Sequence, residues 1–197
     1  AAMRTQRAIE RADICVLMLD AQDGLTREEK KIANTIEDAG KPCVVMMNKW
    51  DLIQGFRMEH CLQAIHRDAP FLKHCPTVFT SATEGRNIDK VFPLVNKVAA
   101  ETHKRIPTGQ LNTFIEQCII ERHPPMITGK RLRIYYLTQT GVNPPTFTLF
   151  VNRPALLTAA YKKYLINKMR KTFRFEGAPL RFYIRGKKAQ LKAAKKS

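Results

Sequence analysis

Short runs of consecutive apolar residues alternate with helical patterns through the first 105 residues of the chain. Residues 14–19 form a continuous apolar run, as a strand buried on both faces of a parallel sheet does, residues 42–47 predict the next buried strand, and residues 77–80 predict a third strand. Between and after them, apolar residues recur three or four positions apart, as on one face of a helix. Strands and helices in alternation build a parallel sheet through crossover connections, so residues 1–105 predict an α/β domain.

Local signals mark the ends of the first helix that follows residues 14–19. Thr26 and Glu29 form a capping box, in which a hydroxyl and a carboxylate each bond a backbone N–H at the helix start. Gly40 can adopt the left-handed conformation that ends a helix. The same periodicity predicts a helix around residues 58–65 and another over residues 88–103.

The pattern changes after residue 106. The predicted elements are a helix around residues 111–118, strands over residues 131–137 and 146–151, a helix over residues 154–172 and a strand over residues 179–185. This order predicts a small α/β sandwich over residues 106–186, with its helices on one face of a short sheet. Residues 187–197 are rich in lysine and poor in apolar side chains, so we expect them to form a disordered basic tail.

The net charge of +17 is concentrated in the second half of the chain. Residues 1–100 hold 14 Lys and Arg against 13 Asp and Glu, whereas residues 101–197 hold 20 against 4. Ordinary solubility needs a net charge of only about 2–8 for a small domain. A cationic second half therefore favours contact with nucleic-acid phosphates over a surface that is merely solvated.

Composition also excludes several classes of protein. The sequence has no run of 18 or more apolar residues and no apolar signal segment at its start, so we expect a cytoplasmic chain with no membrane contact. The five cysteines form no C-x-x-C pair, and we expect them to be reduced, buried thiols. The five histidines show no metal-ligand spacing, so no zinc site is predicted.

Polar motifs follow two of the predicted strands directly. Asn48-Lys49-Trp50-Asp51 follows residues 42–47, and Ser81-Ala82-Thr83 follows residues 77–80. In open α/β sheets, ligands bind at the carboxyl ends of strands, where both motifs are expected to lie. The two motifs match the N-K-x-D and S-A-x motifs of GTPases. They are specific only together, because either short motif alone also occurs by chance in ordinary turns.

The residue types of these motifs suit guanine. The Asp51 carboxylate can accept hydrogen bonds from guanine N1–H and from the exocyclic amino group, a pair of donors that adenine lacks. The Asn48 amide can bond guanine N7 and tie the two loops together, and the Lys49 stem can cover the base. The Ala82 backbone N–H can donate to guanine O6. Asn48, Lys49, Asp51, Ser81, Ala82 and Thr83 are therefore the predicted guanine-binding residues.

The phosphate-binding motifs of a GTPase are missing from the sequence. No G-x-x-x-x-G-K-[ST] occurs, and no Asp is followed by Gly three residues later. We therefore expect residues 1–105 to be the rear part of a G domain, without its phosphate loop and switch elements. By itself this chain is not expected to hydrolyse GTP or to bind nucleotide tightly.

Several segments resemble the Der (EngA) family of double GTPases. Residues 3–13 (MRTQRAIERAD), 20–26 (DAQDGLT) and 48–52 (NKWDL) are similar to the second G domain of that family, and residues 151–154 (VNRP) and 175–181 (FEGAPLR) to its KH-like domain. The resemblance implies a bacterial GTP-binding protein that acts in assembly of the large ribosomal subunit. It also implies GTP/GDP and Mg²⁺ as cofactors, and rRNA and the first G domain as partners, with no DNA expected.

The KH-like half lacks the G-x-x-G loop with which RNA-binding KH domains clamp a nucleic-acid backbone. Its cations remain, and they predict phosphate contacts with little reading of bases. The RNA-binding candidates are Lys130, Arg131, Arg133, Lys162, Lys163, Lys168, Arg170, Lys171, Arg181 and Arg185. Two alternatives stay open: the KH-like face can contact a G domain instead, and the whole chain can be a non-enzymatic RNA- or protein-binding module with a vestigial G domain.

Overall fold

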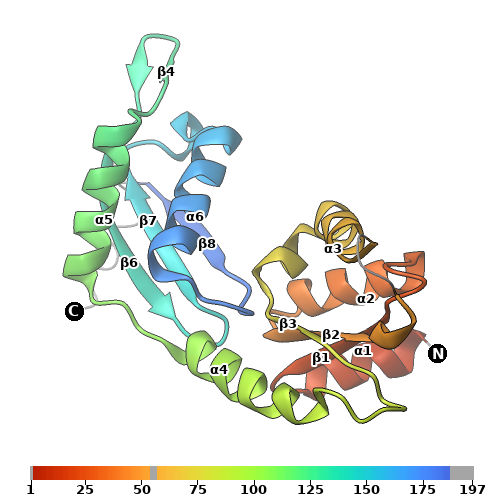
Figure 1. Cartoon of the computed structure of the whole chain (residues 1–197). Helices are drawn as coiled ribbons and strands as arrows, with labels where there is room; N and C mark the ends of the chain where they lie inside the picture. The colour runs from red at the N-terminus through yellow and green to blue at the C-terminus, as the bar shows by residue number, and fades with distance from the viewer. Residues whose placement is uncertain (1, 54–56, 187–197) are drawn as a thin grey trace. The chain divides into compact units, whose positions relative to one another are not determined.

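A computed structural model describes residues 2–53 and 57–186, and the chain divides into two compact units (Figure 1). Unit 1 holds residues 1–104 together with the short segment 175–179. Unit 2 holds residues 105–174 and 180–197. The predicted basic tail, residues 187–197, lies outside the described residues.

Unit 1 is built on a parallel sheet, as predicted, and the α/β class is confirmed. Its three strands pair in the order β1 (Cys15–Asp20), β2 (Cys43–Asn48) and β3 (Thr77–Phe79). The helices are α1 (Ala2–Arg11), α2 (Arg27–Asp38), α3 (Arg57–Asp68) and α4 (Val91–His103), with short 3₁₀ turns η1 (Trp50–Leu52), η2 (Pro70–His74) and η3 (Ile88–Lys90).

The signals that the sequence places around α2 act as expected. The backbone N–H of Thr26 donates to Glu29 Oε2 at 3.1 Å, which is the reciprocal bond of a capping box. At the other end Gly40 has φ +68°, and its N–H donates to the Glu37 carbonyl at 2.9 Å. A left-handed glycine after the last turn satisfies a carbonyl that the helix leaves free.

The main core of unit 1 lies on one face of the sheet. The inward side chains of β1 and β2 pack there against buried residues of α2 and α3, such as Ile36 and Ile65. Strand β2 is buried on both faces, as predicted, but the same prediction for β1 is wrong. Val16 and Met18 are 43% and 55% exposed, because the described residues cover only one face of β1, a strand that pairs only with β2 among them.

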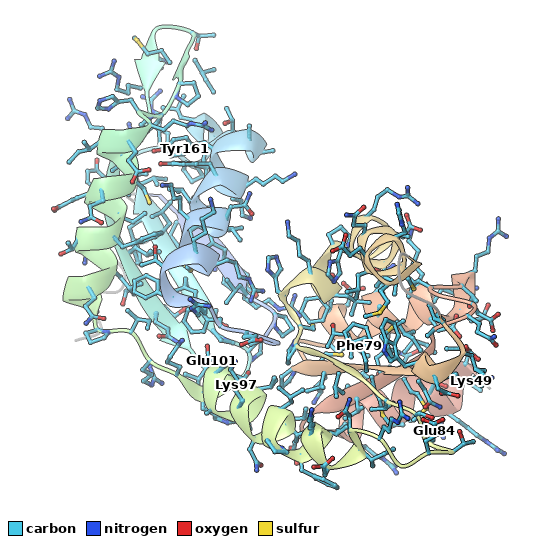
Figure 2. The ribbon with its side chains drawn as sticks, in the orientation of Figure 1. Lys49, Phe79, Glu84, Lys97, Glu101 and Tyr161 are labelled. Carbon is cyan, nitrogen blue, oxygen red and sulfur yellow. The ribbon has the colours of Figure 1, made fainter. Side chains whose placement is uncertain are left out.

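The segment 175–179 belongs to unit 1 although it lies far from residues 1–104 in sequence. Gly177 joins it to the sheet: its N–H donates to the His74 carbonyl at 2.6 Å, and its carbonyl accepts from Cys43 N–H at 2.8 Å. A glycine is required there, since φ is +79° and a Cβ atom would lie 2.6 Å from a Val98 methyl group. A Lys97–Glu176 ion pair adds to this attachment at 2.5 Å (Figure 2 labels Lys97).

Unit 2 is the predicted sandwich of helices on a short sheet. Strands β6 (Ile134–Gly141), β7 (Thr146–Val151) and β8 (Arg181–Arg185) form the sheet, with β6–β7 antiparallel and β7–β8 parallel. Helices α5 (Thr108–Glu121) and α6 (Ala159–Phe173) contact each other through Phe114 and Phe173, whose ring centroids are 5.3 Å apart. Tyr161, Leu165 and Met169 of α6 are buried in this core.

Two boundaries in unit 2 differ from the prediction. Residues 130–131 do not begin the first long strand: β4 (Met126–Ile127) and β5 (Lys130–Arg131) form a separate hairpin beyond the end of α5 (Figure 1). The turn residues Thr128 (φ 48°) and Gly129 (φ 71°) both have positive φ. Two consecutive residues with positive φ are typical of a tight hairpin turn.

The long helix also starts later than predicted. Pro154–Leu156 form a 3₁₀ turn (η4), and α6 begins at Ala159 because the Thr158 hydroxyl caps it by accepting from Tyr161 N–H at 3.1 Å. Leu157 therefore precedes the helix that it was expected to join. Within the described residues, none of the helices has the length and apolar character to cross a membrane.

Candidate functional site

The loops that follow β2 and β3 meet at the carboxyl edge of the unit 1 sheet. Asn48 is the last residue of β2, and its Oδ1 accepts from the Ala82 backbone N–H at 3.1 Å and from the Thr80 hydroxyl at 3.5 Å. Trp50 N–H donates to the Thr80 carbonyl at 3.2 Å, which adds a second link. One side chain amide and one backbone bond thus hold the two polar motifs together.

Lys49 and Trp50, the two middle residues of the Asn48–Asp51 motif, set its backbone conformation. Lys49 has φ 58°, a left-handed conformation that costs a non-glycine residue about 1–2 kcal/mol, and it turns the chain into η1. Trp50 then packs on Phe79 of β3, with ring centroids 4.3 Å apart. This contact anchors the turn, so Asp51 is carried outward and is exposed.

The Asp51 carboxylate is available for a ligand. None of residues 2–53 and 57–186 bonds to it, whereas the neighbouring Asn48 amide oxygen already has two protein donors. An exposed, unpaired carboxylate beside a fixed amide can accept a pair of N–H donors from a planar ligand.

The Ser81–Thr83 motif is held by a compact loop. Ser81 is buried, and it exchanges two backbone bonds with Arg86, at 3.1 and 3.3 Å. Its hydroxyl lies 3.3 Å from the Thr83 hydroxyl and accepts from Glu84 N–H at 3.4 Å. Ser81 and Thr83 therefore shape the loop, while Ala82 presents its backbone at the surface.

Asp20 is a site residue that the sequence did not single out. It ends β1 directly beside Asn48, and its Oδ2 lies 2.6 Å from Lys49 Nζ. Its other carboxylate oxygen accepts from Gln22 N–H at 2.9 Å. The bond from Lys49 lowers the pKa of Asp20, and the bond to Asp20 raises the pKa of Lys49. Figure 2 shows Lys49 and Glu84 at the same end of unit 1.

The structure distributes the predicted RNA-binding residues over four places. Lys130 and Arg131 lie in the β5 strand of the hairpin, Arg133 follows it, Arg181 and Arg185 lie on β8, and Lys162, Lys163, Lys168, Arg170 and Lys171 lie on α6. Three of the α6 residues, Lys163, Lys168 and Lys171, line one hollow of about 400 Å³ together with Arg122 and Tyr164.

Two features of this hollow could not be predicted from the sequence. Lys168 is paired with Glu121 of α5, so it is not a free cation. Arg122 follows α5 directly, and its guanidinium lies 4.8 Å from the centre of the Tyr164 ring. The only sequence signal for Arg122 was a cation at a helix carboxyl terminus, where the helix dipole favours positive charge.

The cysteines and histidines of the described residues offer no second site. Four of the five cysteines are buried, and burial raises the pKa of Cys15 and of Cys118 to about 11. Thiols with such values are inert at neutral pH. Among residues 2–53 and 57–186, no group of three His, Cys, Asp or Glu side chains is arranged to hold a metal ion.

Comparison with known families assigns both parts of the chain. Residues 2–118 match the family model of the elongation factor Tu GTP binding domain. Residues 105–185 match the model described as the KH-domain-like region of EngA bacterial GTPase enzymes, C-terminal.

Curated relatives named GTPase Der match nearly the whole chain. The one from Protochlamydia amoebophila is 60% identical over 187 residues, which are 95% of this chain and 38% of the relative. The one from Acetivibrio thermocellus is 40% identical over 190 residues, covering 95% of this chain and 43% of the relative. The chain therefore spans about two fifths of the length of these relatives.

Solved structures show a weaker likeness. A crystal structure of Aquifex aeolicus Era bound to GDP and aluminium fluoride has a TM-score of 0.43 and 19% identity, over 91% of this chain and 66% of Era.

Proposed function

The chain belongs to the Der (EngA) family of GTPases, and from that premise we propose that residues 1–105 form the guanine-recognition part of a GTP-binding domain. Two observations support the proposal. The Asn48 amide oxygen accepts from Ala82 N–H, and the exposed Asp51 carboxylate of the same motif has no partner among the described residues. The Asn48 amide holds the two loops together, whereas the exposed Asp51 carboxylate bonds none of the described residues and so is not needed by the fold.

The roles of the residues follow from their donors and acceptors. Asp51 accepts from guanine N1–H and from the exocyclic amino group, and Asn48 donates its amide N–H to N7. The Lys49 stem lies over the base while Asp20 holds its ammonium group at 2.6 Å. Ala82 N–H, already bonded to Asn48, reaches guanine O6 only by sharing its hydrogen between the two acceptors.

We propose that GTP hydrolysis requires a gene product in which these residues and a phosphate loop belong to the same domain. The phosphates and Mg²⁺ need a G-x-x-x-x-G-K-[ST] loop, and residues 1–197 contain none. The exposed face of β1, with Val16 and Met18, is a surface that a further part of such a domain would cover. The 197-residue chain alone is expected to bind nucleotide weakly and to show no turnover above buffer.

Residues 106–186 form the KH-like module of this proposal, and rRNA of the large ribosomal subunit is its partner in the cytoplasm. The support is charge: the described part of unit 2 has fourteen Lys or Arg side chains against two Glu side chains. Electrostatic contact with phosphates at that density gives affinity with little sequence preference. Contact between this module and the first G domain is the alternative use of the same charge.

Asn48→Ala tests the proposed base site in the full-length gene product. The change removes a bond to guanine N7 and leaves Ala82 N–H without its acceptor, a loss of about 1–3 kcal/mol. GDP affinity is expected to fall about 5- to 150-fold by titration calorimetry. Asn34→Ala, on the exposed face of α2, removes the same amide away from the site and should leave GDP binding unchanged. Equal GDP affinity of Asn48→Ala and the unaltered protein would remove Asn48 from the site.

A further inference from the structure

A groove runs along α6 of unit 2 on the side that faces the end of α5. It consists of two adjoining hollows, of about 400 and about 240 Å³, which share Arg122 and Ala160 in their walls. The larger hollow extends to Lys171 near the end of α6, and the smaller one to Pro125, the residue before β4. The larger hollow is within the size range of sites that bind small ligands, and the smaller one extends it along α6.

The walls of the groove carry positive charge with little compensation. Arg122, Lys163, Lys168 and Lys171 line the larger hollow, and none of its lining residues is acidic. Lys168 is paired with Glu121, whereas Arg122, Lys163 and Lys171 have no ion-pair partner among residues 2–53 and 57–186. Lys163 and Lys171 are exposed.

The remaining walls are fixed in place. The Tyr164 hydroxyl donates to the Cys118 carbonyl at 2.9 Å, and the Tyr161 hydroxyl donates to the Arg122 carbonyl at 2.8 Å (Figure 2 labels Tyr161). Both bonds tie α6 to the carboxyl end of α5, where the Cys118 carbonyl also accepts from the Arg122 N–H. The groove is therefore formed before a ligand arrives, which lowers the entropic cost of binding.

We propose that this groove binds the phosphate backbone of a single-stranded RNA segment, chiefly through Lys163 and Lys171. The inference rests on the proposed RNA contact of the KH-like module and states where on that module the strand lies. Cationic grooves that follow a backbone are typical of single-strand binding. Stacking of a base on Tyr164 is not part of the proposal, because Arg122 already covers one face of its ring. Binding is consequently indifferent to base sequence.

The test compares variants of the 197-residue chain by fluorescence anisotropy with labelled oligouridylate and oligoadenylate, without nucleotide, at several salt concentrations. Each lost phosphate contact should reduce the magnitude of the slope of log K against log salt by about 0.7, the value for single strands. At about 0.1 M salt this change is worth about 5-fold in affinity. Lys163→Gln/Lys171→Gln should therefore weaken binding to both RNAs about 25-fold and reduce the magnitude of the slope by about 1.4.

A matched variant separates the groove from diffuse charge. Arg105→Gln/Arg153→Gln removes the same number of positive charges from unit 2, at exposed residues that neither line the groove nor are among the predicted RNA-binding residues. It should bind RNA with a nearly unchanged slope, while thermal unfolding checks that both variants remain folded. Equal flattening by the two double variants would overturn the groove as the RNA site, although RNA binding itself would stand.

Two further outcomes would overturn more than the groove. If the unaltered chain binds neither RNA, the proposed RNA contact fails, whereas guanine recognition, measured separately with GDP, is unaffected. If polyglutamate binds in a Lys163-dependent way and RNA does not, the groove is a site for an acidic protein segment.

Discussion

Replacing Asp51 by Asn is expected to change the base preference of the full-length gene product from guanine to xanthine. Loss of two charge-assisted bonds, each worth about 1.5–3 kcal/mol, should weaken GDP binding about 10²- to 10⁴-fold. The amide of Asn can donate to the xanthine carbonyl at the position of the guanine amino group, where a carboxylate would be repelled. XDP affinity should therefore rise in the variant.

The exposure of Asp51 makes this substitution a clean test. Its carboxylate supports no bond among the described residues, so Asp51→Asn should leave the thermal unfolding midpoint nearly unchanged. Affinities of both protein forms for GDP and XDP, measured by competition, give the change in preference. Unchanged GDP binding in a folded variant would show that Asp51 is not part of a base site.

Gly177→Ala is expected to destabilise unit 1 by about 2–5 kcal/mol. The positive φ of +79° costs about 1–2 kcal/mol in alanine, and the new methyl group would overlap Val98 and the Cys43 carbonyl at 2.6 to 2.9 Å. Overpacking of this kind adds about 1–3 kcal/mol. Trp50 is the single tryptophan of the chain and lies in unit 1, so its fluorescence during urea unfolding reports this loss.

Gly85→Ala separates the two contributions. Gly85 has a similar φ of +67° in the same unit, but nothing lies within 4 Å of the position where its Cβ would be. Only the backbone cost of about 1–2 kcal/mol should remain there. Equal losses in the two variants would show that the overlap of the new methyl group with Val98 adds nothing to the cost of Gly177→Ala.

Strand β2 shows how much of the fold the apolar pattern determines. A continuous apolar run needs cover on both faces, and residues 43–47 have it. The same pattern in β1 misled, because residues 14–19 cannot show whether a strand lies at an edge of the described sheet. Burial depends on what lies on each side of a strand, and that is a property of the whole domain.

The hairpin β4–β5 was missed for a different reason. Its strands have two residues each, which is too short for an alternation pattern. In addition, the residues after the turn Thr128-Gly129 lead directly into the predicted strand over residues 131–137. The late start of α6 was missed because Pro154 suits the first turn of a helix as well as the 3₁₀ turn that it begins.

At the candidate site, motif and strand order together placed Asn48 and Ala82 at one edge of the sheet. The sequence could not provide Asp20 as the partner of Lys49, since that pair depends on the register between β1 and β2. Similarly, the Lys168–Glu121 pair joins two helices whose packing the sequence does not state. Charge patterns thus identified the basic elements, but only the structure shows which cations are free.

The coupling between Asp51 and the exocyclic amino group of guanine tests the central claim most directly. It is measured with GDP and IDP, which lacks that amino group, on the full-length gene product and its Asp51→Ala variant. We expect the unaltered protein to prefer GDP about 10- to 150-fold, as for one charge-assisted bond of about 1.5–3 kcal/mol, and the variant to bind both nucleotides alike. An undiminished preference for GDP in the variant would contradict the assignment of Asp51 as the residue that recognises guanine.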